Sequence, residues 1–342
     1  MVWKGLRGGV SKTYSGIDFD IAKSALQKYT RRGIVNKAVL IAVELYRLKE
    51  VGGNPGVTNM HNRIAIMAAE DIGVANLSLT LEVIKFIESG EDDIYKLLTF
   101  IQLMCESKKT RIMSHYWRAY ANTEGREVAI KHGLKLDTQF SEDDINYINE
   151  NINCNTFNEN DPTNLRYYIL MFMKRLLDKD VNAYSWAYFY LEVSKDVTLS
   201  KRKKFINGKG TTGKADILLW KVLSTILDSN IYDILVEAYY NHTESRPFLQ
   251  LAILVAIHKL TYSKLDTDVY VKEWKENRKE LVTQMLSGTY KLEVDDFVID
   301  KHTAKGRNNG KTVQDFVDEG AIIIPQAEEY YDAKLEEIYK IR

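Results

Sequence analysis

Apolar side chains recur every three or four residues along most of the chain, the spacing that places them on one face of an α-helix. Residues 18–50 predict two such helices. Arg31, Arg32 and Gly33 suit the end of the first, because positive charge and glycine are favourable at a helix C-terminus. Residues 51–60 hold three glycines and a proline and predict a loop. Four more helices are predicted at residues 61–73, 77–88, 94–105 and 110–121. This part therefore predicts a helical bundle.

The second half of the chain returns to the same helical pattern after a polar stretch rich in asparagine. Helices are predicted at residues 164–177, 183–193, 215–227, 231–240, 247–259, 271–286 and 328–341. Residues 291–300 alternate apolar and polar side chains, as a strand does, and residues 321–325 are a second strand candidate. The fold class that follows is mainly α, with a small strand-containing terminal segment.

Five parts follow from these patterns. They are an N-terminal arm (1–17), a helical bundle (18–121), a polar connection (122–162), a helical domain (163–287) and a mixed α/β terminal segment (288–342).

Composition and charge exclude several classes of protein. The 342 residues include 47 Lys and Arg against 47 Asp and Glu, so the net charge is zero and any nucleic-acid surface must be local. Two cysteines outside any CxxC pair give no disulfide framework or structural zinc site. The sequence shows neither a signal peptide nor an apolar run of 18 residues, which predicts a soluble, intracellular protein.

The strongest local concentration of positive charge lies between residues 201 and 214, where six basic side chains occur without an acidic one. These residues are Lys201, Arg202, Lys203, Lys204, Lys209 and Lys214. A basic loop of this kind suits the phosphate backbone of a nucleic acid, and a solvated surface loop is the alternative. The run from Gly208 also fits the frame of a P-loop, but Ala215 replaces the hydroxyl that would hold magnesium.

A second polar cluster directly follows the predicted strand at 291–300. Its candidate nucleic-acid contacts are Lys301, His302, Lys305, Arg307 and Lys311. An enzyme of phosphate chemistry is an alternative, in which His302 acts beside Arg307 and Asp300 or Asp295 orients it. A turn with solvated charges, or one that contacts a neighbouring subunit, is the third interpretation. No metal-ligand spacing and no dinucleotide or nucleophile motif is present, so no cofactor is expected.

Two stretches carry a resemblance to a known family. Residues 24–38 read SALQKYTRRGIVNKA, residues 63–76 read RIAIMAAEDIGVAN, and CESKK follows at 105–109. In order and spacing they resemble the C-terminal helical region of the replication-associated recombination protein A (MgsA) family of AAA+ ATPases, which are clamp-loader relatives. The resemblance covers about residues 20–120. It implies a clamp-loader-like bundle, oligomerisation, and attachment to replication or repair machinery.

The sequence also departs from that family. The ATPase module should precede the matching region, yet only about 18 residues do, without a phosphate-binding loop. ATP hydrolysis is therefore not implied. Glu70, Asp71 and Gly73 form the most specific part of the resemblance, and we expect a structural role in which the acidic pair caps the next helix and fixes the turn. Asn76 is a further candidate cap.

The sequence thus favours a non-enzymatic, self-associating accessory protein of DNA replication, recombination or repair that contacts DNA or RNA through its basic loops. Expected partners are a second copy of the chain and replication or repair proteins, with no membrane. The alternatives are a structural or assembly protein, possibly viral, that uses the bundle for subunit contacts, and the phosphate-chemistry enzyme centred on His302.

Overall fold

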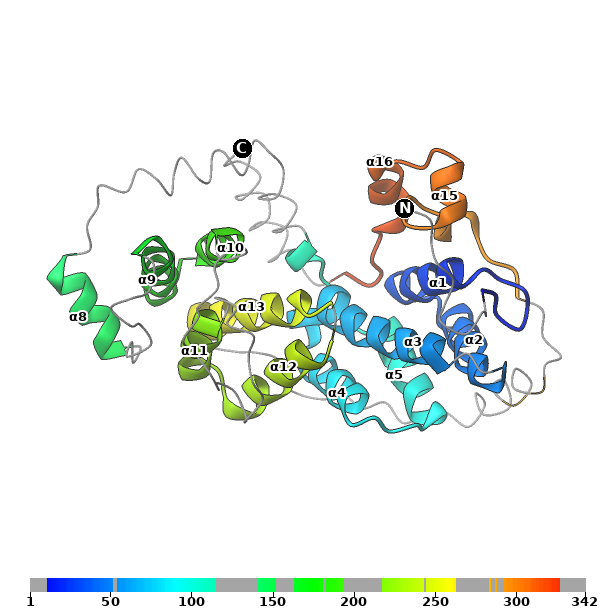
Figure 1. Cartoon of the computed structure of the whole chain (residues 1–342), viewed down its shortest axis with the longest axis horizontal. Helices are drawn as coiled ribbons and strands as arrows, with labels where there is room; N and C mark the ends of the chain where they lie inside the picture. Colours follow the sequence, from blue (N-terminus) through cyan, green and yellow to red (C-terminus); the bar gives the residue numbers. More distant parts are fainter. Residues whose placement is uncertain are drawn as a thin grey trace. The chain divides into compact units, whose positions relative to one another are not determined.

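The computed structural model is mainly α-helical (Figure 1). It describes residues 11–51, 54–114, 141–151, 163–180, 183–193, 217–242, 244–262, 283, 287 and 292–326. In this part 77% of the residues are helical and there are essentially no strands, which confirms the mainly α fold class.

The chain divides into two compact units. The first comprises Met1–Thr110 with Asp266–Ala327, and the second comprises Arg111–Leu265 with Glu328–Arg342. The sequence pattern instead predicts that the bundle ends at residue 121 and that residues 288–342 form a separate segment. The difference arises because residues 292–326 pack against helices near the start of the chain.

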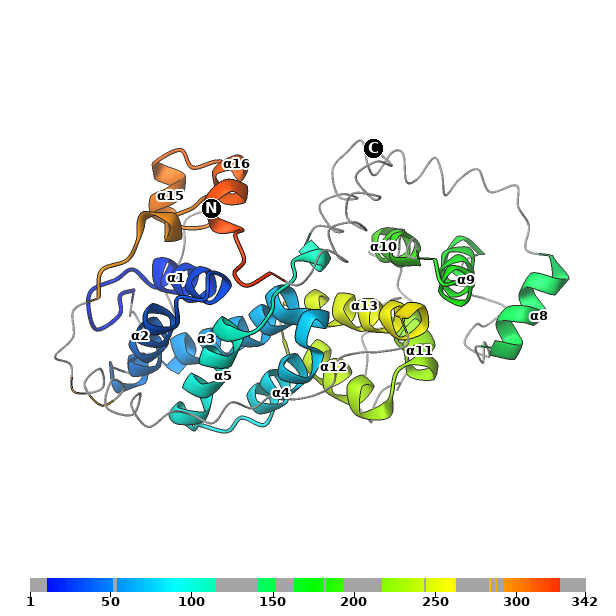
Figure 2. The ribbon, with the colours of Figure 1, turned by 180° about the vertical axis from the view of Figure 1, so that it is seen from behind.

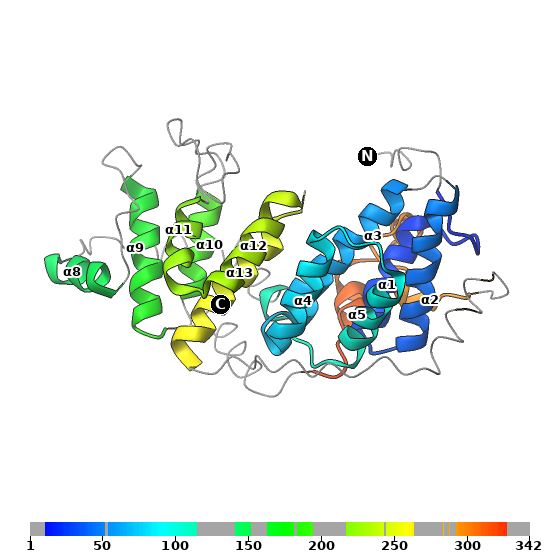
Figure 3. The same cartoon turned by 90° about the horizontal axis from the view of Figure 1, so that it is seen from below.

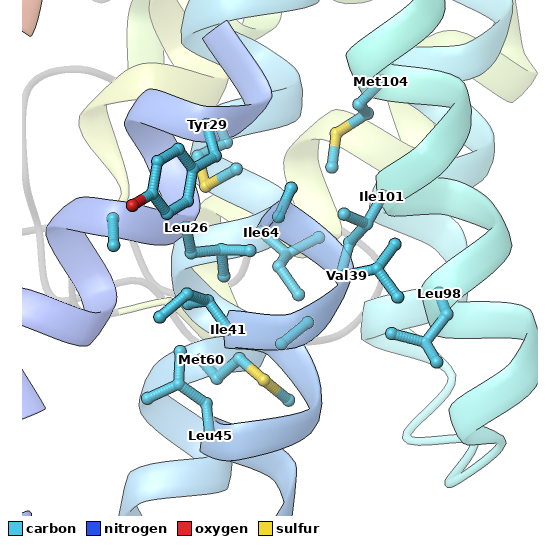
Figure 4. Close-up of a cluster of buried hydrophobic side chains, with 14 of the residues drawn as sticks. Leu26, Tyr29, Val39, Ile41, Leu45, Met60, Ile64, Leu98, Ile101 and Met104 are labelled. Carbon is cyan, nitrogen blue, oxygen red and sulfur yellow. The ribbon is translucent and has the colours of Figure 1, made fainter. Parts of the chain in front are cut away.

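The first unit is a bundle whose helices surround one apolar core (Figure 4). Its helices are α1 (Phe19–Arg31), α2 (Val35–Tyr46), α3 (Asn54–Met67), α4 (Leu77–Glu88) and α5 (Ile94–Glu106). Leu26, Ile41, Ile64 and Ile101 come from four of these helices and are fully buried in the core. The apolar spacing that predicted the helices therefore also supplies the residues that hold them together.

Side-chain hydrogen bonds cap the N-termini of two of these helices. The Asp93 carboxylate accepts from the backbone N–H groups of Tyr95 and Lys96 at 2.9 and 3.1 Å, which caps α5. The Asn76 side chain accepts from the Leu79 N–H at 3.2 Å and caps α4. The expected capping of this helix by Glu70 and Asp71 is wrong, because Asn76 lies at the helix start and Asp71 is bonded to Arg31.

Residues between α3 and α4 remain helical in a π-helical turn, η2 (Ala68–Ile72), and a short 3₁₀ turn, η3 (Gly73–Asn76). The whole run Asn54–Glu88 is long and apolar enough to cross a membrane, and 78% of its most apolar window is buried inside the protein. A core helix of a water-soluble protein passes the same test, so the run carries no conclusion about membranes.

Residues 292–326, here called the return segment, belong to the first unit although the second unit precedes them in sequence. Figures 1 and 2 show its helical turns beside α1. Its elements are η5 (Asp296–Val298), α15 (Ala304–Asn308), α16 (Val313–Asp315) and η6 (Phe316–Gly320). Leu292, Val298 and Ile299 add buried side chains to the bundle core.

The described part of the second unit is also helical. It contains α8 (Glu142–Asn151), α9 (Thr163–Leu177), α10 (Ala183–Val193), α11 (Ile217–Ile226), α12 (Ser229–Asn241) and α13 (Arg246–Tyr262). Helices α9 and α10 pack side by side (Figure 3). Residues 248–257 of α13 are buried on every face, as expected for a central helix that four others contact.

Two predictions of local structure are wrong. The predicted loop at 51–60 contains the start of α3 at Asn54, because Pro55 lies in the first helical turn, where its missing N–H is not needed. The predicted strands at 291–300 and 321–325 are not formed in the described residues. The first contains the 3₁₀ turn η5, and the second stretch is followed by one isolated bridge between Lys109 and Gln326.

Candidate functional site

The basic loop, residues 301–311, begins at a buried ion pair between α1 and the return segment. Lys28 Nζ lies 2.7 Å from Asp300 Oδ2, and the two side chains are 2% and 6% exposed. Burial lowers the pKa of Lys28, whereas the bond to Asp300 acts to raise it. Asp300 therefore points inward and is neutralised inside the protein. The loop that follows contains four basic side chains and no acidic one.

Short-range contacts fix the shape of the basic loop. The Thr303 hydroxyl accepts from the Gly306 N–H at 3.0 Å and caps α15. A side chain at Gly306 would not fit, since its Cβ would lie 1.8 Å from the Asp300 carbonyl oxygen. Arg307 Nη1 donates to the His302 carbonyl at 2.8 Å. Lys305 and Arg307 are exposed, so the loop presents positive charge to solvent from a defined backbone.

Lys301 and Lys311 lie at the edges of this face. Lys301 Nζ is 5.9 Å from the centre of the Phe316 ring. Lys311 Nζ pairs with Glu319 Oε2 at 2.9 Å, and the Glu319 bond raises the pKa of Lys311. Part of the Lys311 charge is therefore compensated, so Lys301, Lys305 and Arg307 carry most of the positive charge.

His302 is arranged for packing more than for proton transfer. His302 is exposed, its ring meets Phe316 edge-on with 5.1 Å between ring centres, and desolvation by the neighbouring groups lowers the pKa of His302. Asp300 accepts from the His302 backbone N–H at 2.7 Å, whereas Asp295 pairs with Lys37 at 2.5 Å. Within the described residues, neither carboxylate is bonded to the imidazole, so the acid–histidine arrangement considered from the sequence is not formed.

The three motifs of the family resemblance meet in space. Arg31 Nε donates to Asp71 Oδ1 at 2.8 Å, and their side chains are 4% and 1% exposed. Gln27 Nε2 donates to the other Asp71 oxygen at 3.1 Å. The Asp71 carbonyl accepts from the Thr110 N–H at 3.0 Å, which ties the turn η2 to the residues after α5. We call Arg31, Gly33, Asp71 and Lys109 the motif junction.

The structural role predicted for Glu70, Asp71 and Gly73 takes a different form. Asp71 joins helices as the partner of buried Arg31, and Glu70 is only partly buried. Gly73 ends the turn with φ 50°, a conformation that favours glycine. Its carbonyl accepts from the Thr80 hydroxyl at 3.1 Å, which holds the turn against α4.

The end of the return segment passes through the motif junction and is bound there by its backbone. Arg31 Nη1 donates to the Gly320 carbonyl at 3.1 Å, and the Arg31 carbonyl accepts from the Ile324 N–H at 2.7 Å. Gly33 has φ +67°, and a Cβ there would lie 3.0 Å from the Ile324 carbonyl oxygen. Glycine at this position therefore allows the two backbones to approach closely.

Lys109 completes the junction from the end of α5. Its side chain is fully buried, and Nζ donates to the carbonyl oxygens of Cys105, Ser107 and Ile324 at 2.7, 2.9 and 2.8 Å. Its backbone N–H donates to the Pro325 carbonyl at 3.0 Å. One lysine thus closes the C-terminal end of α5 and also holds the return segment.

Burial lowers the pKa of Lys109 to about 8, and this predicts a specific pH dependence. Between about pH 8 and pH 10 the unfolded chain keeps this proton while the folded chain loses it. The free energy of unfolding of the first unit should therefore rise with pH in this range, by at most about 1.4 kcal/mol per pH unit. Urea titrations at several pH values measure this free energy. The unfolded fraction at each urea concentration is read from the extent of alkylation of Cys105 in a short pulse. Lys109→Met should remove the rise, and an equal rise in that variant would contradict the assignment.

The sequence pattern did not predict that three basic side chains of this site are buried. Lys28, Arg31 and Lys109 are buried, although lysine and arginine are the residues least expected there. The signal for Lys28 was its place in α1 between buried Ala25 and Tyr29, and the signal for Arg31 was that it follows buried Tyr29 and Thr30.

The other predicted nucleic-acid contacts belong to residues 201–214. Lys201, Arg202, Lys203, Lys204, Lys209 and Lys214 lie outside the described residues. Within the described ranges, no group of three or more His, Cys, Asp or Glu side chains is placed to hold a metal ion.

Comparison with known proteins adds no relative. No family model, no curated protein and no solved structure matches the chain. The resemblance to the MgsA family therefore stays a prediction based on the residues quoted above.

Proposed function

We propose that this chain is a non-enzymatic, self-associating accessory protein of DNA replication, recombination or repair that contacts nucleic acid through its basic loops. The observation that supports the proposal is the composition of the exposed face at residues 301–311. Its nearest acidic residue in sequence, Asp300, points inward and forms an ion pair with Lys28. The charged side chains of residues 301–311 are all positive and are held on a fixed turn, which suits the regularly spaced phosphates of a nucleic-acid backbone. The Asp20 carboxylate approaches this turn only to accept from the Ala304 N–H at 2.6 Å.

Because the net charge of the chain is zero, nucleic acid should be bound by a small basic surface and not by attraction to the protein as a whole. A protein with a zero balance gains no long-range attraction to nucleic acid from its overall charge. Affinity must then come from a few phosphate contacts, and each contact releases counterions. Binding should therefore weaken steeply with salt and depend little on sequence.

Substitution of the basic loop tests this function. Lys301→Ala, Lys305→Ala and Arg307→Ala together should lower affinity for single- and double-stranded oligonucleotides. They should also reduce the slope of log affinity against log salt by about two to three, since each lost phosphate contact contributes about 0.7–0.9. Fluorescence anisotropy at several salt concentrations measures both quantities.

The matched control removes the same charge elsewhere on the first unit. Lys12, Lys85 and Lys96 are exposed, and their triple alanine variant should leave the affinity and the salt slope unchanged. A second variant with Lys201, Arg202, Lys203 and Lys204 changed to Ala tests the other predicted loop. Equal binding by the native chain and the residue 301–307 variant would contradict a role for this face.

A further inference from the structure

Aromatic side chains lie beside the basic loop, where the return segment contacts α1. They are Phe297 of η5, His302 of the basic loop and Phe316 of η6. His302 is exposed, and the two phenylalanines are half-buried. This face therefore presents aromatic surface to solvent as well as positive charge.

Three cationic groups lie around the Phe316 ring. Lys28 Nζ, Arg31 Cζ and Lys301 Nζ are 6.0, 5.9 and 5.9 Å from its centre. At these distances the negative face of an aromatic ring attracts a cation. The His302 ring lies against Phe316 at an interplanar angle of 81°. These contacts hold the two rings in a defined arrangement at the edge of the basic loop.

The second phenylalanine, Phe297, has a guanidinium group on its face. Arg32 Cζ lies 3.9 Å from the centre of the Phe297 ring, and Arg32 Nη2 donates to the Glu319 carbonyl at 2.7 Å. Tyr29 contacts Phe297 edge-on, with 5.7 Å between ring centres. Arg32 is half-buried, so part of this side chain stays open to solvent. A planar cation held on a ring is a surface on which a nucleobase stacks.

Lys28 and Arg32 bring these groups together. Lys28 Nζ donates to the Phe297 carbonyl at 2.9 Å and also lies beside the Phe316 ring. Arg32 contacts the Phe297 ring of η5 and bonds to η6 through Glu319, and the two turns contact each other. We call this linked set of side chains the aromatic strip, and its members are Phe297, Arg32, His302 and Phe316.

The aromatic strip and the basic loop together match unpaired nucleotides. A base stacks on a ring or a guanidinium plane only when its face is free, and in a duplex the neighbouring base pairs cover both faces. Phosphates need cations, which Lys301, Lys305 and Arg307 supply in the same loop as His302. Charge alone attracts single and double strands, so the strip is the feature that distinguishes them.

We propose that the aromatic strip binds the bases of a single-stranded nucleic acid whose phosphates lie against the basic loop. This inference rests on the nucleic-acid contact in the proposed function and adds the form of the ligand. The stacking groups are His302, Phe316 and the Arg32 guanidinium plane. A single strand therefore binds more tightly than a duplex of the same length, by about fivefold or more for each stacked base.

Three DNA probes of equal length test this proposal by fluorescence anisotropy. They are oligothymidine of about 12 nucleotides, an abasic strand that keeps the phosphates without the bases, and the duplex of the first with its complement. The full-length chain carries alanine in place of Lys201, Arg202, Lys203 and Lys204, so that the other predicted basic loop does not contribute. Oligothymidine should bind about fivefold or more tightly than either of the other probes.

His302→Leu is the first variant, because His302 is exposed and its loss leaves the core intact. It should reduce the preference for oligothymidine, and addition of Phe316→Leu should abolish it. The slope of log affinity against log salt should not change at pH 7.5, since the lowered pKa of His302 leaves the imidazole neutral there. His302→Phe keeps a ring and should retain the preference.

The matched control is Tyr95→Leu, which removes a ring that is 44% exposed on α5. It should leave the affinity for all three probes unchanged. Urea titrations with alkylation of Cys105 check that every variant is folded.

Equal, salt-sensitive binding of the three probes would overturn the base contact and leave the proposed function standing. A native chain that binds none of them would overturn both. A preference for oligothymidine that persists in the His302→Leu, Phe316→Leu chain would place the base contact outside the strip and overturn the proposal. Binding that is lost when residues 201–204 are changed to alanine would also overturn it, because the ligand would then lie on the other loop.

Discussion

Asp71→Asn is expected to lower the free energy of unfolding of the first unit by about 3–5 kcal/mol. The Asp71 carboxylate is the charged partner of Arg31 at 2.8 Å, and both side chains are almost completely buried. Asparagine keeps the shape but removes the negative charge, which leaves the guanidinium buried without compensation. Urea titration followed by alkylation of Cys105 reports unfolding of this unit, because that thiol is 1% exposed in its core. Cys154→Ser in the background leaves a single reactive thiol.

The control for Asp71→Asn is Glu82→Gln on the exposed face of α4, which should change the free energy of unfolding by no more than about 0.5 kcal/mol. A second variant separates lost charge from lost shape. Arg31→Met combined with Asp71→Leu removes both charges and should be less destabilised than Asp71→Asn. If the double variant were the less stable of the two, uncompensated charge could not be the cause.

Lys109→Met is expected to destabilise the first unit by about 2–4 kcal/mol below pH 8. Methionine fills a similar volume but leaves the carbonyl groups of Cys105, Ser107 and Ile324 without their donor. The loss should be greatest at the end of the return segment, where the Lys109 ammonium group donates to the Ile324 carbonyl. Hydrogen exchange measured by mass spectrometry should increase, relative to the native chain, more at residues 320–326 than in α2 and α3.

Lys108→Met is the matched control for Lys109→Met, because the neighbouring lysine is exposed. It should leave both the free energy of unfolding and the exchange of residues 320–326 close to native. Equal protection of the return segment in the Lys109→Met and native chains would show that Arg31 and Gly33 hold it without the ammonium group.

These variants address a part of the molecule where stability and the proposed function meet. Lys28 and Asp300 orient the basic loop, and Arg31 and Lys109 hold the chain that follows it. A variant of the junction should therefore weaken oligonucleotide binding only through displacement of the loop. The surface variant at Lys301, Lys305 and Arg307 should weaken binding without a change in stability. Measuring both quantities on both variants separates the two causes.

The sequence by itself determined most of the helices. Periodic apolar positions placed α1, α2, α4, α5 and α13 nearly at their observed bounds, because helix formation and burial of one face follow from neighbouring residues. It also placed a helix end at Gly73, which follows the turn η2. It failed at Asn54–Met60, where glycine and proline were outweighed by packing of buried Gly56 and Met60.

The tertiary structure alone decided what the buried charges do. Lys28 and Asp300 are far apart in sequence, and so are Lys109 and Ile324, so no local pattern pairs them. The same reason explains the missing strands. Residues 291–300 alternate like a strand and residues 321–325 are a short apolar run. In the described part of the chain neither stretch finds a neighbouring strand, and they bond instead to α1 and the end of α5. A helix is stabilised by bonds within itself, whereas a strand or a buried ion pair depends on a partner that only the fold supplies.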